Sequence, residues 1–243
     1  MKKPIKRQKV RAPYALIIHR EKYAIQYFKA LQTAYWLKRA FKTPENLTII
    51  TLHNYHEKSL FEQSLDYLGI KDYIVLNESF EGFWRHTFKI RWILNYLNSG
   101  VCKTEYLLYC DARDSILRVN PQEVIDLFKE REVDLLFNSS ASKRGYPCML
   151  DIFEWTKTVA HKSGRYLNAG AFIGKTEFIK KVFEEANKYV DPNNPIEVRG
   201  PRNREKFPDF PKGTDDQVIF RFLEPQFYPE LSVDYINRIF YRN

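Results

Sequence analysis

Tyr106-Leu-Leu-Tyr-Cys-Asp-Ala-Arg-Asp-Ser-Ile-Leu117 is the stretch of sequence that decides the fold. Its first five residues are apolar or aromatic without interruption, which is the pattern of a strand buried on both faces of a sheet. Two carboxylates, Asp111 and Asp114, follow this strand. Ligands of open α/β sheets bind beyond the carboxyl ends of the strands, and two acids in a tight turn can share one hard cation such as Mg²⁺ or Mn²⁺. The stretch therefore predicts a metal site, against the plainer interpretation of two acids that cap a helix or form a turn.

Strands and helices alternate on both sides of this stretch. Strand-like apolar runs cover residues 14–19, 46–52, 73–76 and 133–138. Apolar residues at helical spacing cover residues 23–41, 57–68, 87–97, 121–129 and 176–189. This alternation predicts an α/β fold with a mostly parallel, Rossmann-like sheet flanked by helices. With 44% apolar residues, a chain of 243 residues is large enough for one such domain, which we place over residues 1–243.

Three later segments carry polar residues or glycines at the edges of apolar runs. Arg165-Tyr-Leu-Asn-Ala-Gly-Ala-Phe-Ile-Gly-Lys175 contains Asn168 and Gly170, and a glycine allows a backbone to approach a ligand closely. Gly213-Thr-Asp-Asp-Gln-Val-Ile-Phe220 opens with two adjacent acids and an amide, and Leu231-Ser-Val-Asp-Tyr-Ile-Asn-Arg-Ile-Phe240 closes the apolar pattern. Each segment alone is weak evidence of a site.

In this order, the segments resemble the glycosyltransferase domain of the procollagen lysyl hydroxylases and the related GT-A transferases. The pattern of that family is D-x-x-D after a hydrophobic strand, then L-N-S-G-x-F-I-G, then D-D-Q, then L-D-x-x-x-x-I-F. The matching residues here are Asp111 with Asp114, then 167–174, 215–217 and 234–240, and Lys89-Ile-Arg-Trp92 is similar to the K-V-R-W segment of the family. The resemblance implies a GT-A-like fold and a metal-dependent transfer of sugar from a nucleoside diphosphate, with UDP expected, to a hydroxyl of a polymeric acceptor.

The resemblance also implies roles for individual residues. The expected ligands of Mn²⁺ or Mg²⁺ are Asp111, Asp114 and Asp234. The residues expected to bind the nucleotide-sugar donor are Lys89, Arg113, Gly170, Gln217 and Arg238. Asn168, Asp215 and Asp216 are expected to bind sugar hydroxyls, and Asp215 or Asp216 would also act as the base if the reaction inverts the anomeric carbon.

Two positions depart from the pattern of the family. Arg113 stands where the lysyl hydroxylases have an aromatic residue that stacks on uracil, and Tyr235 stands where they have a metal-binding histidine. Plainer interpretations also stay open for three other residues. Asp215 could cap a helix that begins near Gln217, and Arg238 and Lys89 could be surface charges.

The net charge of +9 bears on the acceptor. Basic residues gather in an N-terminal arm (residues 1–12) and in a proline-rich loop (residues 191–213) that we expect to cover the site. Such charge is typical of proteins that approach a polyanion. The acceptors that stay open are a hydroxylated nucleobase in DNA, an anionic glycan and hydroxylysine in a collagen-like protein. A basic nucleic-acid or glycan binder without turnover is the non-enzymatic alternative.

Three cysteines without metal-binding spacing suit a reducing compartment. No apolar stretch approaches the roughly 20 residues needed to span a bilayer, and the basic N-terminus has no apolar region typical of a secretory signal. We therefore expect a cytoplasmic protein.

Overall fold

The computed structural model describes residues 17–19, 24–26, 28–29, 40–160, 165–191, 197–198 and 203–241. The basic arm (residues 1–12) lies outside the described residues, and so does most of the helix expected over 23–41. Of the proline-rich loop (residues 191–213), residues 192–196 and 199–202 lie outside them as well.

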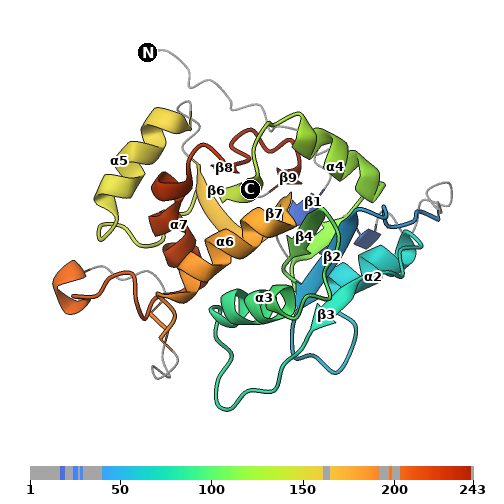
Figure 1. Cartoon of the computed structure of the whole chain (residues 1–243), viewed down its shortest axis with the longest axis horizontal. Helices are drawn as coiled ribbons and strands as arrows, with labels where there is room; N and C mark the ends of the chain where they lie inside the picture. The colour runs from blue at the N-terminus through green and yellow to red at the C-terminus, as the bar shows by residue number, and fades with distance from the viewer. Residues whose placement is uncertain are drawn as a thin grey trace, which may run out of the picture.

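A central sheet of six strands has the order β3-β2-β4-β7-β6-β8 (Figure 1). Antiparallel β7 runs between β4 and β6, while the β3-β2, β2-β4 and β6-β8 pairs are parallel. The predicted mostly parallel sheet is therefore confirmed. The strands are β2 (Leu47–Leu52), β3 (Ile74–Leu76), β4 (Tyr106–Cys110), β6 (Leu135–Ser140), β7 (Tyr166–Lys175) and β8 (Leu231–Val233).

A second, three-stranded sheet has β1 (Ile17–His19) between β5 (Ser115–Leu117) and β9 (Phe240–Tyr241). Of the strand expected over 14–19, residues 17–19 form β1, which pairs outside the central sheet, and residues 14–16 lie outside the described residues. Residue His19 lies opposite Ser115 in the antiparallel β1-β5 pair. Since β5 begins directly after Asp114, this pairing places the end of β1 beside the acidic turn that follows β4.

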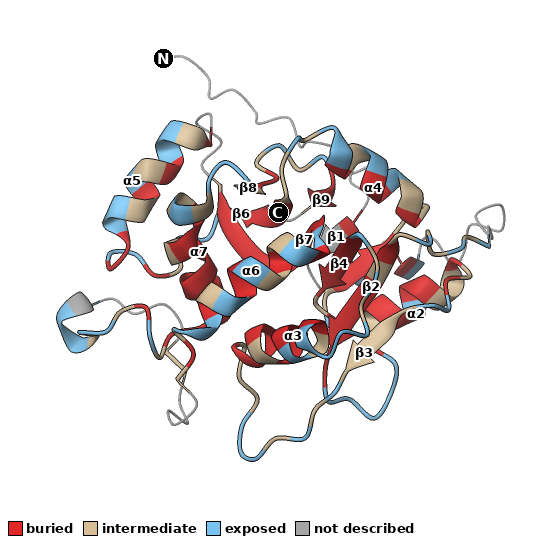
Figure 2. Cartoon of the chain, viewed as in Figure 1, coloured by how far each residue is buried: buried red, intermediate tan, exposed pale blue. Residues whose placement is uncertain are grey.

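Helices pack against both faces of the central sheet, as the predicted α/β fold requires. The side chains of β4 alternate between two hydrophobic cores, because successive residues of a strand point to opposite faces. Leu107 and Tyr109 join a core with α3 (Phe88–Asn98), α6 (Thr176–Asn187) and α7 (Asp216–Phe227). Leu108 and Cys110 join a core with α2 (Leu60–Tyr67) and α4 (Pro121–Lys129). Figure 2 shows the central strands as buried and the outer faces of α4 and α6 as exposed.

Two further helices lie away from these layers. They are α5 (Leu150–Val159), which packs against α7, and the short 3₁₀ helix η3 (Arg204–Lys206). Across the described ranges, no helix is long and apolar enough to cross a membrane.

Candidate active site

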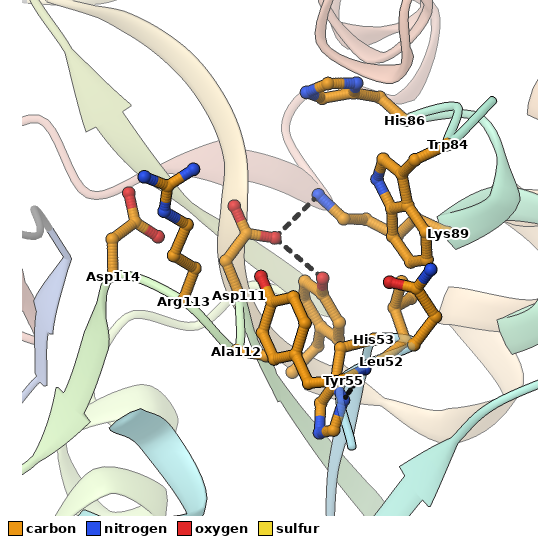
Figure 3. A pocket seen from close by; sticks show the side chains of 12 residues that line it. Leu52, His53, Tyr55, Trp84, His86, Lys89, Asp111, Ala112, Arg113 and Asp114 are labelled. Carbon is orange, nitrogen blue, oxygen red and sulfur yellow. Dashed lines mark hydrogen bonds and ion pairs between the residues drawn. The ribbon is translucent and has the colours of Figure 1, made fainter. Parts of the chain in front are cut away.

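A cavity of about 420 Å³ opens where β2 and β4 end and where the chain enters α3. Six of its lining residues matter for the chemistry: Tyr55, Trp84, His86, Lys89, Asp111 and Asp114. Figure 3 shows the Asp111 carboxylate turned into this cavity, with Lys89 paired to it. The Tyr109 hydroxyl also donates to this carboxylate. The position agrees with the rule that ligands of α/β folds bind beyond the carboxyl ends of the strands.

The acidic turn meets a histidine from β1. The Nε2 atom of His19 lies 3.2 Å from Asp114 Oδ2 and 3.7 Å from Asp111 Oδ2. His19 is buried, whereas the Asp111 and Asp114 side chains are 33% and 27% exposed. One ligand atom from each of the three residues lies within 4.8 Å of the others. Two carboxylates and an imidazole thus converge on one point at the edge of the cavity.

Gly170 makes room for this histidine. A Cβ atom added at Gly170 would lie 1.6 Å from the His19 Cε1 atom, so any larger residue would displace the ring. The carbonyl of Gly170 also accepts a hydrogen bond from the Asp111 backbone N–H at 2.8 Å. Gly170 therefore positions both His19 and Asp111, in addition to any contact with a ligand that its lack of a side chain allows.

Lys89 connects the acidic turn to the start of α7. Its Nζ atom lies 3.1 Å from Asp111 Oδ1 and 2.7 Å from Asp216 Oδ2, and it donates to the Ala169 carbonyl at 2.8 Å. Burial disfavours the charged ammonium, but the two carboxylates more than offset this, so the pKa of Lys89 is raised and the side chain stays protonated. Lys89 is buried, so it is not the solvated surface charge of the plainer interpretation.

Asp215 caps α7, as the plainer interpretation of the sequence had it. Its Oδ1 atom accepts the Val218 backbone N–H at 2.9 Å, and its Oδ2 atom accepts a bond from Arg144 at 3.0 Å. Burial and the adjacent Asp216 charge raise the pKa of Asp215 to about 6, although Arg144 opposes the shift. Asp216 accepts a hydrogen bond from the Gln217 backbone through its other oxygen.

Asn168 and Gln217 belong to one buried amide network between β6, β7 and α7. The Asn168 side-chain amide donates to Gln217 Oε1, and its carbonyl oxygen accepts bonds from Asn138 at 3.3 Å and from the Gly170 backbone at 3.2 Å. Both side chains are nearly inaccessible to solvent. They hold the strand that carries Gly170 against the helix that carries Asp216.

The structure does not bring Asp234 or Arg238 to this cluster. The Asp234 carboxylate is fully buried and accepts three backbone N–H groups, from Arg238 at 3.0 Å, Ile239 at 2.7 Å and Phe240 at 2.9 Å. These bonds hold the turn before β9, and Asp234 is not among the ligand atoms that converge with those of Asp111 and Asp114. The Arg238 guanidinium forms an exposed ion pair with Glu130 at 2.6 Å, as the surface-charge interpretation proposed, and it does not line the cavity.

Tyr235, which the resemblance placed where a metal-binding histidine would be expected, turns into the protein interior. Its hydroxyl donates to Glu224 Oε1 at 2.6 Å. Burial raises the pKa of Glu224 to about 7, against the opposing influence of Tyr235 and of the buried Arg221. Tyr235 therefore packs against the core beneath α7. His19, from β1, is the residue that lies beside the acidic turn.

Sequence reasoning missed His19. The available signal was that His19 ends an apolar strand, just as Asp111 follows the end of β4. Arg113, in contrast, lies where expected, since it lines the cavity between Asp111 and Asp114 (Figure 3).

Comparison with known protein families gives one match. The model of the PLOD GT domain family matches residues 49–194, which is more than half of the chain. The matched range includes the acidic turn and β7, but it ends before Asp215 and Asp234. No curated protein matches this chain. Among solved structures, a glycosyltransferase involved in the glycosylation of the major capsid of PBCV-1 shares 18% sequence identity and a TM-score of 0.41, over 77% of this chain and 80% of the other. A likeness this distant carries no inference about function.

Proposed function

The chain belongs to the family of PLOD GT domains, so it is a glycosyltransferase, and we propose that it moves a sugar from a UDP-sugar to a hydroxyl group of a polymeric acceptor with the help of a divalent metal ion. One observation carries the proposal. His19, Asp111 and Asp114 offer three ligand atoms within 4.8 Å of one another beside a cavity large enough for a nucleotide.

The chemistry of this cluster suits a divalent cation. Carboxylates are the ligands that Mn²⁺ and Mg²⁺ prefer, and neutral imidazole is the commonest nitrogen ligand of metals in proteins. Asp111 and Asp114 are partly exposed toward the cavity, so an ion held there has access to a bound ligand. When bound, the ion supplies Lewis-acid stabilisation to the negative charge of a diphosphate leaving group. We assign His19, in place of Asp234, as the third protein ligand.

Lys89 and Tyr109 orient Asp111 for this task. The Tyr109 hydroxyl donates to Asp111 Oδ1 at 2.7 Å, and Lys89 lies 3.1 Å from the same oxygen. Burial and the Asp111 charge raise the pKa of Tyr109, so its hydroxyl stays protonated and remains a donor. Both contacts hold Oδ1, while Oδ2 is the Asp111 oxygen nearest to His19. The buried ammonium of Lys89 also adds positive charge on the wall of the cavity, where it favours an anionic ligand.

The arrangement favours a positioning role for Asp215 and Asp216 over a role as general base. Each of their four carboxylate oxygens accepts a hydrogen bond, and both side chains are almost completely buried. Because both acids are buried, an acceptor hydroxyl could reach neither of them without a rearrangement of the surrounding side chains. We therefore propose that they fix Lys89, Arg144 and the start of α7, and that Asn168 and Gln217 hold β7 against this helix.

The net charge of +9 supports a polyanionic acceptor. Binding of double-stranded DNA, measured at several salt concentrations, tests the nucleic-acid option directly. An affinity that falls steeply as salt rises supports it, and no binding at low salt excludes it. A sulfated glycan in the same assay tests the second option.

A donor panel tests the proposed function. The protein is incubated with UDP-sugars with and without Mn²⁺, and the released UDP is measured by mass spectrometry. We expect metal-dependent release from at least one donor and its loss in Asp111→Ala, while Asp151→Ala, which removes an exposed acid from α5, retains full activity. Full activity of Asp111→Ala, or no release from any donor, would contradict the proposal.

A further inference from the structure

Tyr55 presents an aromatic ring to the same cavity as the acidic turn. Tyr55 is 44% exposed and lies three residues after the end of β2, whereas most large aromatic residues in the described part of the chain are less exposed. In Figure 3 the ring extends from the end of β2 toward Asp111, whereas Trp84 and His86 come from the segment before α3. Single exposed aromatic residues are common on protein surfaces, so the place of Tyr55 in the cavity and the contacts of its ring matter more than its exposure alone.

The ring of Tyr55 is supported by contacts with His53. It stacks on the His53 ring with centroids 4.7 Å apart and an angle of 17° between the planes. The Tyr55 backbone N–H also donates to His53 Nδ1 at 3.0 Å. Since this nitrogen is an acceptor, the ring proton of a neutral His53 lies on Nε2, which is 2.7 Å from Glu62 Oε2.

Glu62 anchors this pair to a helix. The same Oε2 atom accepts the Ser59 backbone N–H at 2.7 Å and completes the capping box at the start of α2. Burial works against the charged form of Glu62, but the hydrogen bonds from Ser59 and His53 prevail and lower the pKa of its carboxyl. Tyr55 is therefore the exposed end of a buried, charge-assisted chain of contacts, so its ring is ordered before any ligand binds.

The other two large aromatic residues that line the cavity are engaged elsewhere, since Tyr109 is buried and donates to Asp111, and Trp84 packs against other rings. Trp84 makes edge contacts with Phe88 at 5.7 Å, Trp92 at 5.6 Å and Phe80 at 5.8 Å between ring centroids. These contacts place Trp84 at the margin of the core beneath α3. Tyr55, which is 44% exposed and lines the cavity while it stacks on His53, is better placed to receive a flat ligand.

Starting from the proposed function, we infer that Tyr55 is the platform on which the nucleobase of the donor stacks, with His53 as the residue that positions it. An aromatic face attracts any nucleobase, because every base has a π surface. The adjacent Asn54 also lines the cavity, and its side-chain amide offers both a donor and an acceptor to the edge of a base. The base would thus lie at the β2 side of the cavity and the diphosphate at the acidic turn.

Isothermal titration with separate parts of the donor tests this inference. UDP, GDP, ADP and CDP are titrated in the presence of Mn²⁺ to find the nucleotide that binds best, and inorganic pyrophosphate is titrated as the ligand without a base. We expect Tyr55→Ala to raise the Kd of that nucleotide about 10-fold or more, and to change the Kd of pyrophosphate less than about 2-fold. Tyr55→Phe retains the ring and should bind the nucleotide with nearly the affinity of the wild type.

Tyr228→Ala is the matched control, because Tyr228 is also 44% exposed and also contacts one aromatic ring, that of Trp155, but it does not line the cavity. This variant should bind the nucleotide as the wild type does. Equal nucleotide affinities of Tyr55→Ala and the wild type, or an equal loss for pyrophosphate, would overturn the inference and leave the proposed function standing. A wild-type protein that binds none of the four nucleotides would overturn both.

Discussion

Two acidic pairs of this protein look alike in the sequence and differ in the structure. Asp111 and Asp114 follow β4, are about a third exposed, and face a cavity and a histidine. Asp215 and Asp216 begin α7, are almost fully buried, and have every carboxylate oxygen hydrogen-bonded within the protein. The first pair is accessible to an external cation, whereas each oxygen of the second pair already has a partner within the protein and no exposure to a ligand.

Lys89 joins the two pairs, since its ammonium contacts both Asp111 and Asp216. The comparison shows that the number of acids near a site says little about their roles. What separates the roles is whether a carboxylate oxygen retains access to a ligand. Substitutions in the buried pair should therefore change the stability of the fold, and substitutions in the exposed pair should change metal binding and turnover.

The largest effect is expected for Asp216→Ala. This change leaves the buried Lys89 ammonium with Asp111 as its one remaining carboxylate partner, and loss of one partner of a buried ion pair costs about 3 kcal/mol or more of unfolding free energy. Urea unfolding followed by circular dichroism measures this loss. Asp66→Ala is the control, because Asp66 pairs with the mainly exposed Lys58 and Lys71 and should cost less than about 1 kcal/mol. Equal losses in both variants would show that Asp216 contributes no more to stability than an acid whose partners are mainly exposed.

Asp114→Asn should act on turnover and leave the stability unchanged. The substitution removes a charged ligand from the exposed pair without disturbing Lys89, so we expect UDP release to fall about 100-fold, which corresponds to about 2.7 kcal/mol. The thermal midpoint should stay within about 2 °C of the wild type. A variant that retains more than a tenth of the wild-type rate would show that Asp114 does not hold the metal.

His19→Ala should weaken Mn²⁺ binding roughly 10-fold, because the acidic pair keeps two of the three proposed ligands. Isothermal titration with Mn²⁺ alone measures this change without any turnover. Gly170→Ala should weaken binding to a similar degree, since the added Cβ would displace the His19 ring. In the His19→Ala background, Gly170→Ala should then have little further effect. Additive losses would indicate that Gly170 acts on the metal site by another route.

The smallest effect concerns the pH dependence of stability. The pKa of Asp215 is raised from 3.8 to about 6 by burial and by Asp216, so the folded protein binds more protons than the unfolded chain between these values. The stabilising contribution of Asp215 is present below pH 3.8 and is lost as the pH rises through about 6. The side chain of Asp215→Asn cannot ionise. From pH 4 to pH 7, the unfolding free energy of this variant should therefore rise relative to that of the wild type by on the order of 1 kcal/mol. Urea unfolding at both pH values tests this, and a constant difference would contradict it.

Local sequence patterns predicted the fold and the acidic turn that follows β4. The unbroken apolar run before Asp111 predicted β4, and apolar residues at helical spacing over 121–129 predicted α4, because both signals depend on neighbouring residues alone. The cap on α7 was also readable, since a side chain at the N-cap bonds to a backbone group three residues later.

The other half of the site depends on long-range pairing that the sequence does not display. His19 reaches the acidic turn because β1 pairs with β5, almost one hundred residues later in the chain. Asp234 matched the expected position of a ligand, but its carboxylate accepts hydrogen bonds from three backbone N–H groups that follow it. Spacing alone cannot tell an acid that binds its own turn from one that binds a ligand.

Electron spin echo spectroscopy of bound Mn²⁺ tests the central claim most directly, because it detects nitrogen nuclei in direct contact with the ion. We predict one bound ion per chain with the ¹⁴N coupling of a single imidazole, and loss of that coupling in His19→Ala. Bound Mn²⁺ without this coupling, or a coupling that persists in His19→Ala, would contradict the assignment of His19, Asp111 and Asp114 as the metal site.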